Sequence, residues 1–186
     1  MASDTRTRMI EGAARLLAER GLQETSFSEV LELTGAPRGS IYHHFPDGKD
    51  QLVGSAVELA GARAMALMES KAGASALEVT DYFLFIWREI LTRSNYASGC
   101  SVLAVTVATD STDLLDGAAA VFDAWREQLA GLLVRGGLDA TDATPFAALL
   151  IASTEGAVVM SRAERSTAPF DAVAHMLRSQ VGVLAA

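Results

Sequence analysis

The sequence has a single cysteine, Cys100, so the chain can form no internal disulfide. No uninterrupted apolar run approaches the roughly 20 residues that span a bilayer, and the opening stretch MASDTRTRMIEGAARLL lacks the apolar centre of a secretory signal. Zinc-ligand spacings, phosphate-binding glycine loops and Gly-x-Ser-x-Gly elbows are also missing. We therefore expect a soluble, cytoplasmic protein with no membrane partner, no catalytic residues, no cofactor and no metal.

Positive charge is scarce in this sequence. The 15 Lys and Arg are outnumbered by 23 Asp and Glu, which gives a net charge of −8, whereas a basic surface is the usual first sign of nucleic-acid binding. The deficit is uneven, because residues 1–50 carry six basic against eight acidic side chains, and between Gly35 and Lys49 the basic residues outnumber the acidic one. An acidic protein with such a local patch can still bind DNA, with modest non-specific affinity.

The chain has 186 residues, of which half are apolar. These apolar residues recur with the period of an α-helix along almost the whole sequence. Apolar residues recur at three- and four-residue steps from Ile10 to Leu17, which predicts a first helix. A second, short helix is predicted in TSFSEVLEL, where Ser26 or Ser28 can cap its first turn. Pro37 can open a third short helix, because proline is tolerated in a first turn whose N–H groups lack partners.

Longer helices are predicted after these three. Apolar stripes mark helices over about 49–71, 142–165 and 169–184, together with several between them. The valine-rich stretch 101–108 would suit a strand, but the sequence offers no partner strand, so we interpret it as a helix. The expected fold class is all-α, with about nine helices.

The two short helices on either side of Gly35 have the spacing of a helix-turn-helix, in which the second helix enters the major groove of DNA. Apolar side chains would fill the angle between them, and the outer face of the second helix would be rich in hydrogen-bond donors and almost free of carboxylates. An ordinary helical corner inside a core is the alternative that spacing alone leaves open. The predicted outer face consists of Arg38, Gly39, Ser40, Tyr42 and His43.

The stretch TGAPRGSIYHHFPDGK, residues 34–49, resembles the signature of the TetR/AcrR family of transcriptional regulators. The family's usual form is Ala-Gly-Val-Ser-x-Gly-Ser/Thr-Leu/Ile-Tyr-x-His/Tyr-Phe, followed by a lysine. The upstream AARLLAERGLQETSFSEVLELTG extends the resemblance, which covers about residues 6–54. This sequence departs from the pattern in having Thr34 for alanine, Pro37 for serine and one extra residue before Lys49. The positions that match are Gly35, Gly39, Ser40, Ile41, Tyr42, His44, Phe45 and Lys49.

The resemblance implies a homodimeric regulator, which we expect to be a ligand-responsive repressor. It implies an N-terminal three-helix helix-turn-helix domain for DNA binding at residues 1–48 and a C-terminal helical ligand-binding and dimerisation domain at residues 49–186. The partners would be a near-palindromic double-stranded DNA operator and a small apolar or aromatic effector. Arg38 would contact guanine and Tyr42 a phosphate. The predicted DNA-binding residues are Thr25, Ser26, Ser28, Arg38, Gly39, Ser40, Tyr42, His43 and Lys49.

An effector pocket is implied in the C-terminal domain, where bulky and adaptable side chains are concentrated. Taken singly, such side chains are more often plain core than pocket wall. Asp81, Arg88, Tyr96 and Glu155 are possible polar handles for a ligand. The predicted ligand-binding residues are Met65, Met68, Phe83, Trp87, Cys100, Phe122, Trp125 and Met160.

Small residues at three- and four-residue steps in FAALLIASTEGAVVMS, residues 146–161, allow two helices to approach closely. This pattern suits a dimer interface made of two helices from each subunit. Packing within one subunit is the alternative reading of the same pattern. The predicted interface residues are Ala147, Leu150, Thr154, Ala157, Ser161, Phe170, Val173, Leu177 and Val181.

The residues alone leave other classes of function open. His43 and His44 are adjacent, but neighbouring residues on a helix point about 100° apart, so their rings do not converge on one metal ion. Cys100 could be a nucleophile, yet Arg93 is the nearest basic residue and no histidine lies near it in sequence, which favours a buried, inert thiol. A helical small-molecule-binding protein without a DNA function is the main alternative, and the acidic charge favours it.

Overall fold

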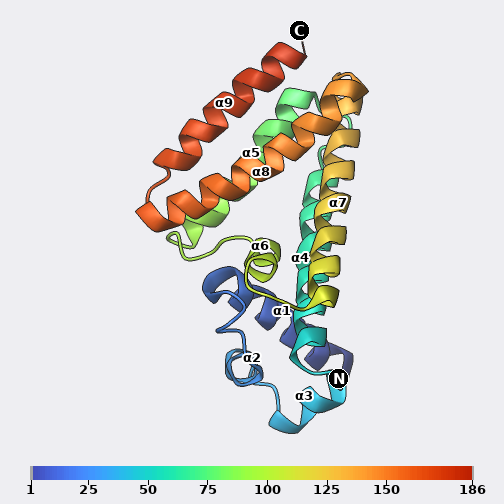
Figure 1. Ribbon diagram of the computed structural model, residues 1–186, viewed down its shortest axis with the longest axis vertical. Helices are drawn as coiled ribbons and strands as arrows, with labels where there is room; N and C mark the ends of the chain where they lie inside the picture. Colours follow the sequence, from blue (N-terminus) through green and yellow to red (C-terminus); the bar gives the residue numbers. More distant parts are fainter. Residues whose placement is uncertain (1, 186) are drawn as a thin grey trace. The chain divides into compact units, whose positions relative to one another are not determined.

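The computed structural model describes residues 2–185, and across this range the chain forms nine α-helices and no strand (Figure 1). The predicted all-α fold is confirmed. The helix predicted over 101–108 is present as well, somewhat shorter than expected. In chain order the helices are α1 (Ala2–Arg20), α2 (Phe27–Thr34), α3 (Arg38–His44), α4 (Lys49–Glu69), α5 (Ala76–Arg93), α6 (Ser101–Thr106), α7 (Thr112–Arg135), α8 (Ala140–Glu164) and α9 (Ala168–Leu184).

The chain forms two compact units, and the long helices α4 and α7 contribute residues to both. The first unit comprises the residues up to Ala62 together with Cys100–Val121, and the second comprises Arg63–Gly99 together with Phe122–Ala186. The first unit therefore extends beyond residues 1–48, because the beginning of α4, α6 and the beginning of α7 pack with the three short helices. A functional boundary after residue 48 stays a prediction.

The core of the first unit lies where α1 packs against α2 and α6. Met9 and Leu17 of α1 are fully buried, as are Val102 and Val105 of α6. Removing these apolar side chains from water stabilises the unit by roughly 1.5–3 kcal/mol each. Because α6 packs on α1, the helices that carry the helix-turn-helix rest on a chain segment from much later in the sequence.

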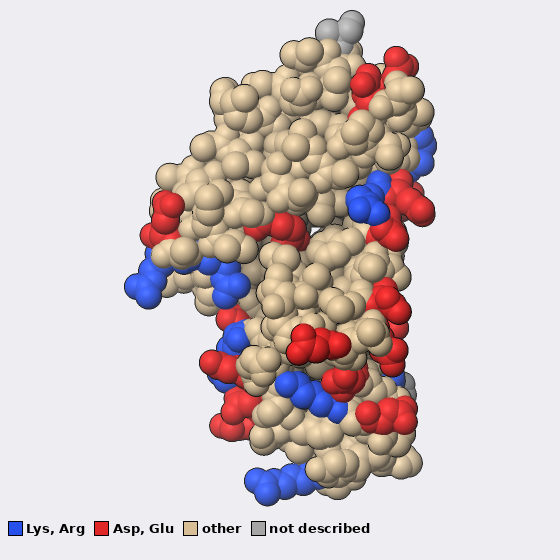
Figure 2. Space-filling view, viewed as in Figure 1, with Lys and Arg blue, Asp and Glu red and all other residues tan. Residues whose placement is uncertain are grey.

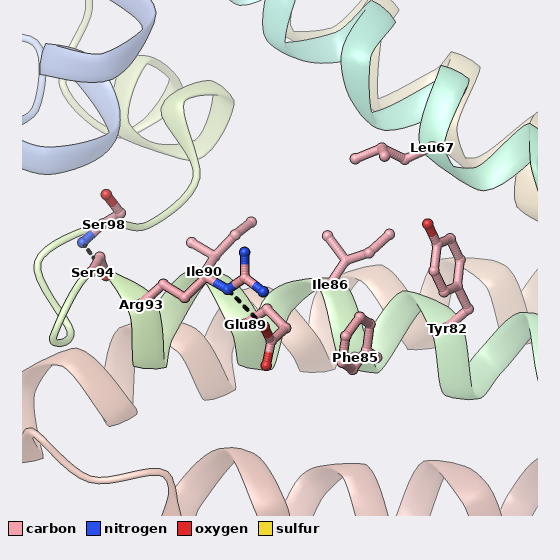
Figure 3. A pocket seen from close by; sticks show the side chains of 9 residues that line it. All are labelled: Leu67, Tyr82, Phe85, Ile86, Glu89, Ile90, Arg93, Ser94 and Ser98. Carbon is pink, nitrogen blue, oxygen red and sulfur yellow. Dashed lines mark hydrogen bonds and ion pairs between the residues drawn. The ribbon is translucent and has the colours of Figure 1, made fainter.

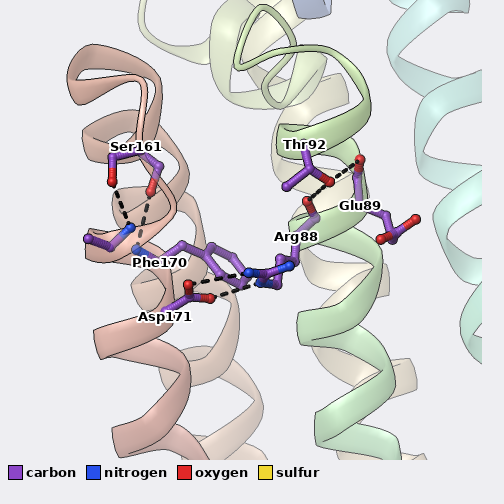
Figure 4. A network of polar contacts seen from close by, with 8 residues as sticks. Arg88, Glu89, Thr92, Ser161, Phe170 and Asp171 are labelled. Carbon is purple, nitrogen blue, oxygen red and sulfur yellow. Dashed lines mark hydrogen bonds and ion pairs between the residues drawn. The ribbon is translucent and has the colours of Figure 1, made fainter.

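In the second unit, α9 packs against both α8 and α5. The turn between α8 and α9 is held by Ser161, whose Oγ accepts a hydrogen bond from the backbone N–H of Phe170 at 3.2 Å (Figure 4). Nearby, Arg88 of α5 donates to Asp171 of α9 at 2.9 Å. Thr92 donates to the Arg88 carbonyl, one turn back along α5. These polar contacts surround a core in which Phe170 is almost fully buried.

Within residues 2–185, α8 is the one helix whose length and composition would allow it to cross a membrane. We expected no such segment, because no uninterrupted apolar run approaches 20 residues, but an 18-residue window of α8 still has a mean hydropathy of 1.5. Half of that window is buried inside the chain itself. Burial of this kind is typical of the core helix of a globular protein.

Candidate nucleic-acid interface

The helix-turn-helix begins at Ser26 and turns at Gly35. The Ser26 side chain accepts a hydrogen bond from the Glu29 N–H and so caps α2, as predicted. Gly35 has φ +64°, a left-handed conformation that costs glycine little, and its N–H closes the helix on the Leu31 carbonyl. Pro37 then precedes α3, with no side-chain hydrogen bond at that cap. The turn residues therefore set where α2 ends and where α3 begins.

The inner sides of α2 and α3 are apolar and buried. Val30, Ile41 and Phe45 are each at most 1% exposed, and they occupy the space where α2 and α3 meet the rest of the unit. Phe27, at the start of α2, holds the Tyr42 ring edge-on with centroids 5.8 Å apart. Packing therefore fixes which face of α3 points to solvent.

The outward face of α3 carries the side chains that the sequence predicted there. Arg38, Gly39, Tyr42 and His43 are exposed, and Tyr42 is 71% exposed although its ring rests against Phe27. Ser40 is half-buried, and its hydroxyl donates to the Pro37 carbonyl at 2.6 Å. The face thus presents a guanidinium, a phenol and an imidazole, with a glycine between them. Each of these groups can donate a hydrogen bond to a base edge or a phosphate.

Other predicted contacts are occupied within the chain. Thr25 is only 1% exposed and its hydroxyl donates to the Gly21 carbonyl at 2.8 Å, so its side chain is not presented to a phosphate. Lys49 is half-buried and its Nζ donates to the Leu22 carbonyl at 2.8 Å. Ser28 remains exposed, and its hydroxyl is 2.8 Å from that of Ser26. The structure therefore gives Thr25 and Lys49 structural contacts that sequence spacing did not reveal.

Two arginines of α1 lie beside the helix-turn-helix and were missed from the sequence. The Arg6 guanidinium lies 5.3 Å from the centroid of the Phe45 ring and reaches the Ser55 hydroxyl at 3.4 Å. Arg8 reaches the Thr34 carbonyl, at the end of α2, at 3.4 Å. The sequence signal was the basic TRTR stretch preceding the first apolar stripe, which we read as an ordinary polar start of a helix.

The surface of this unit is mixed in charge rather than basic. Figure 2 shows acidic and basic side chains side by side over its visible face, with no continuous basic area. The two adjacent histidines differ in environment: His43 is exposed, whereas His44 is half-buried, with its ring centroid 6.5 Å from that of Phe45. Among residues 2–185, no three His, Cys, Asp or Glu side chains gather as a metal site would require. On the visible face, the exposed donors of α3 are therefore not part of a larger basic area.

The predicted ligand-binding residues differ in burial and in the unit to which they belong. Met160 is 47% exposed on α8. Cys100 caps α6 in the first unit, where its Sγ accepts from the Leu103 N–H at 3.4 Å. Two of the suggested polar handles, Asp81 and Arg88, form ion pairs with α9. Those buried as core are Met68, Phe83, Trp87, Cys100 and Trp125, and those half-buried are Met65 and Phe122.

The residues predicted for a dimer interface are largely covered by their own chain. Eight of the nine side chains are at most 4% exposed, and only Val173 is half-buried, because α8, α9 and α5 pack on one another. A side chain with no accessible surface has nothing to offer a second copy. The large apolar side chains that α8 and α9 leave exposed are Leu149, Val159, Met160, Met176 and Val183.

Two family models match the chain. One, described as "Bacterial regulatory proteins, tetR family", matches residues 9–56, which contain α2 and α3. The other, described as "Transcriptional regulator LmrA/YxaF-like, C-terminal domain", matches residues 76–176. Together they span the exposed recognition face and most of the second unit.

Curated relatives are similar over nearly the whole chain. An HTH-type transcriptional regulator of Mycobacterium tuberculosis H37Rv is 37% identical over 181 residues, covering 94% of this chain and 92% of the relative. The HTH-type regulator YxaF of Bacillus subtilis is 27% identical over 178 residues, covering 94% and 93%. A solved TetR transcriptional regulator from Chloroflexus aurantiacus has a TM-score of 0.80 at 28% identity, covering 97% and 96%. One from Agrobacterium tumefaciens has a TM-score of 0.83 at 22% identity over both full chains, a likeness of fold alone.

Proposed function

Since the chain belongs to the TetR family and is a DNA-binding transcriptional regulator rather than an enzyme, we propose that it is a repressor released from its operator by a small molecule. We further propose that it acts in the cytoplasm as a homodimer on a near-palindromic operator. A two-fold dimer would place its two α3 helices in major grooves about one helical turn, roughly 34 Å, apart. The effector would be an apolar or aromatic molecule.

The observation that carries the DNA-binding part is the outward face of α3. Arg38 and Tyr42 stand free of the core, and that face carries no carboxylate of its own. Arg38 can make a bidentate contact to guanine, worth about 1–3 kcal/mol of discrimination. Because the whole protein is acidic, non-specific attraction is weak, and the α3 contacts carry a large share of the affinity.

The dimer is supported by a stripe of exposed residues along α8, which we call the α8 seam: Leu149, Ala152, Gly156 and Val159. If two α8 helices cross antiparallel about a two-fold axis near residue 154, Leu149 lies opposite Val159 of the second copy and Ala152 lies opposite Gly156. Small residues meet at the centre and larger ones flank them, so the seam is self-complementary. Met176 and Val183 of α9 would extend the same apolar face.

The release mechanism follows from a two-state equilibrium. Effector would favour a dimer in which the two α3 helices no longer fit successive grooves, with α4 carrying the change from the second unit. To move the equilibrium from mostly bound to mostly released, the effector must bind the two states with affinities that differ by about 10⁴-fold. An effector with equal affinity for both states would change nothing.

The test is fluorescence anisotropy of the purified protein on DNA from upstream of its own gene, at several salt concentrations. We expect tight, salt-sensitive binding that random DNA does not reproduce, and a loss of about tenfold or more in Arg38→Ala. The matched control is Arg135→Ala, an exposed arginine of the second unit that should bind DNA like the wild type. Equal and weak binding of both DNAs at low salt would instead favour a ligand-binding protein without a DNA role.

A further inference from the structure

A hollow of about 580 Å³ lies on the face of α5 opposite its buried side (Figure 3). Phe83, Leu84 and Trp87 turn into the core of the second unit, whereas the hollow is lined by the other face of the same helix and by Leu67 of α4. None of the residues predicted to bind ligand lines it. Its volume falls in the range of small-molecule sites, about 300–1,000 Å³.

One end of the hollow is aromatic. The rings of Tyr82 and Phe85 stack with centroids 6.3 Å apart and planes 20° apart, and Phe85 is 53% exposed. Figure 3 shows the Tyr82 hydroxyl pointing toward Leu67, with Ile86 between the aromatic end and the rest of the hollow. Covering a flat, water-exposed apolar surface of this kind with another ring lowers the free energy.

The other end of the hollow offers hydrogen-bond donors. Arg93 uses Nε to donate to Glu89 at 2.7 Å, but its two Nη groups have no partner among the described residues. Figure 3 shows the Arg93 guanidinium lying back along α5 toward Ile86, over the hollow rather than away from it. The Ser98 hydroxyl, at the same end, likewise has no partner in the described part of the chain. A ligand that pairs with these donors must carry hydrogen-bond acceptors.

The charges around the hollow favour a negative ligand. The lining itself has one cation, Arg93, and one carboxylate, that of Glu89. Lys71 lies beside the aromatic end, with Nζ 4.7 Å from the centroid of the Tyr82 ring, where it also faces Glu78. The positive charge that a ligand would meet is therefore that of the Arg93 Nη groups, which Glu89 does not contact. A carboxylate on the ligand could take both Nη donors of Arg93 in the fork-to-fork geometry that arginine favours.

We propose that this hollow binds a flat aromatic molecule that carries a carboxylate. Its ring would stack on Tyr82 and Phe85, and its carboxylate would bind Arg93 and Ser98. Phe85 and Arg93 are eight residues apart on α5, about 12 Å at 1.5 Å per residue, and the Arg93 guanidinium reaches back toward Ile86, which shortens the span. One or two fused rings with a short acidic arm fit this shorter length.

The end of the site that carries the Arg93 and Ser98 donors is next to the segment that leads into α6. Asn95 and Tyr96 hold left-handed conformations, with φ +50° and +63°. The following residues are held from α8, since Arg162 donates to the Ala97 carbonyl at 2.8 Å and a Cβ on Gly99 would come within 2.6 Å of the same guanidinium. Directly after Gly99 the chain enters α6, which packs on α1. We infer that ligand bound at Ser98 is the effector signal, a step that rests on the proposed function.

The experiment uses 2-naphthoate as the probe and 2-naphthamide as its neutral counterpart, titrated calorimetrically into the full-length protein. We expect naphthoate to bind, naphthamide to bind at least tenfold more weakly, and Arg93→Gln to weaken naphthoate about tenfold. Arg126→Gln is the matched control, because Arg126 is likewise an exposed arginine of the second unit paired with an acid on its own helix, Asp123. Phe85→Ser should weaken both probes, and thermal melts should show that every variant is folded.

Three results would overturn the site: no heat from either probe at millimolar concentration, equal binding of the two probes, or an unchanged affinity in Arg93→Gln. A change of oligomeric state in Phe85→Ser would overturn it as well, by assigning the face to a protein contact. Adding naphthoate to the DNA-binding assay separates the two proposals. If naphthoate binds at Arg93 but leaves DNA affinity unchanged, the site stands and its effector role is wrong. If the protein binds no DNA at all, the proposed function fails independently of the site.

Discussion

Arg88 of α5 and Asp171 of α9 form an ion pair, with Nε 2.9 Å from Oδ1. The same pair recurs in reverse two turns away, where Arg178 of α9 meets Asp81 of α5 at 2.6 Å. Each helix thus carries an aspartate followed seven residues later by an arginine. Only antiparallel pairing of these helices brings unlike charges together, because parallel pairing would oppose like charges. All four side chains are nearly half exposed, so the pairs select direction and register more than they stabilise.

Charge reversal tests this relationship. Asp171→Arg places a second guanidinium against Arg88 and should lower the free energy of unfolding by about 1 kcal/mol. The double variant Arg88→Asp with Asp171→Arg should recover most of that loss, because the pair is restored in the opposite sense. Urea unfolding measures both, with Glu58→Arg on the exposed side of α4 as control. If the losses in the free energy of unfolding of the two single variants simply add in the double variant, the two residues are not coupled.

The same pair predicts a pH dependence. The hydrogen bond from the Arg88 guanidinium holds the pKa of the Asp171 carboxyl below its ordinary value of 3.8. A lowered folded-state pKa means that the pair's contribution is fully present above the unfolded value and is lost as pH falls through the folded value. The stability difference between wild type and Asp171→Asn, about 0.5 kcal/mol for so exposed a pair, should be constant above about pH 5 and vanish in stronger acid. A difference that grows in acid would contradict this sign.

Gly136 is required by a close backbone approach at the end of α7. Its carbonyl accepts a hydrogen bond from the Ala76 N–H at 2.9 Å, and a Cβ at this position would lie 2.5 Å from that nitrogen. Gly136→Ala should therefore lower stability by about 2 kcal/mol, because neither backbone can move freely. Gly117→Ala is the control, since nothing lies near Gly117 within α7 and alanine there should stabilise by up to about 1 kcal/mol. Equal melting temperatures for the two variants would refute the argument.

Lys49 should behave as a structural residue of the first unit. Its Nζ donates to the Leu22 carbonyl just beyond α1, so Lys49→Met should cost about 1–2 kcal/mol of stability. The slope of log DNA affinity against log salt concentration should stay unchanged. Loss of a true phosphate contact would instead reduce the magnitude of this slope by about one, since one ion fewer is released on binding. Chemical unfolding and salt-dependent anisotropy measure the two quantities. A shallower salt slope together with wild-type stability would instead show that Lys49 contacts a DNA phosphate.

The α8 seam makes the dimer testable with one substitution. Gly156→Arg puts a long charged side chain at the centre of the proposed two-fold contact, where only small residues fit, and should convert a dimer into a folded monomer. Val107→Arg is the control, because Val107 is 74% exposed in the first unit and should leave the mass unchanged. Sedimentation equilibrium reads both masses. A dimer that survives in Gly156→Arg would place the interface elsewhere.

The sequence by itself determined the local elements of this protein. Ser26 sets where α2 begins, Gly35 where it ends and Pro37 where α3 begins, because capping and backbone freedom depend on near neighbours alone. The outward face of α3 was also readable, since a short amphipathic helix has only one apolar side to bury. The all-α class followed from periodicity along the whole chain.

Tertiary structure alone decided the long-range roles. Lys49 was predicted as a phosphate contact, but its Nζ donates to the Leu22 carbonyl, 27 residues away, and this contact depends on how the first helices fold back on one another. The Thr25 hydroxyl bonds locally, to the Gly21 carbonyl four residues earlier, whereas the burial of its side chain depends on the packing around it. On α5, bulky side chains occupy both faces, and only packing settled that Phe83 and Trp87 turn inward while Tyr82 and Phe85 line the hollow.

The helix α8 shows most clearly that periodicity in the sequence does not reveal which face of a helix is buried. Its residues are apolar or small nearly all the way round, so periodicity could not tell Leu150 and Ala157, which its own chain covers, from Leu149 and Gly156, which it leaves exposed. Hydrophobic attraction has no direction, and a helix with two apolar faces is satisfied by either one. The packing of α9 and α5 on one face, with the ion pairs that align them, decided which face of α8 remained exposed.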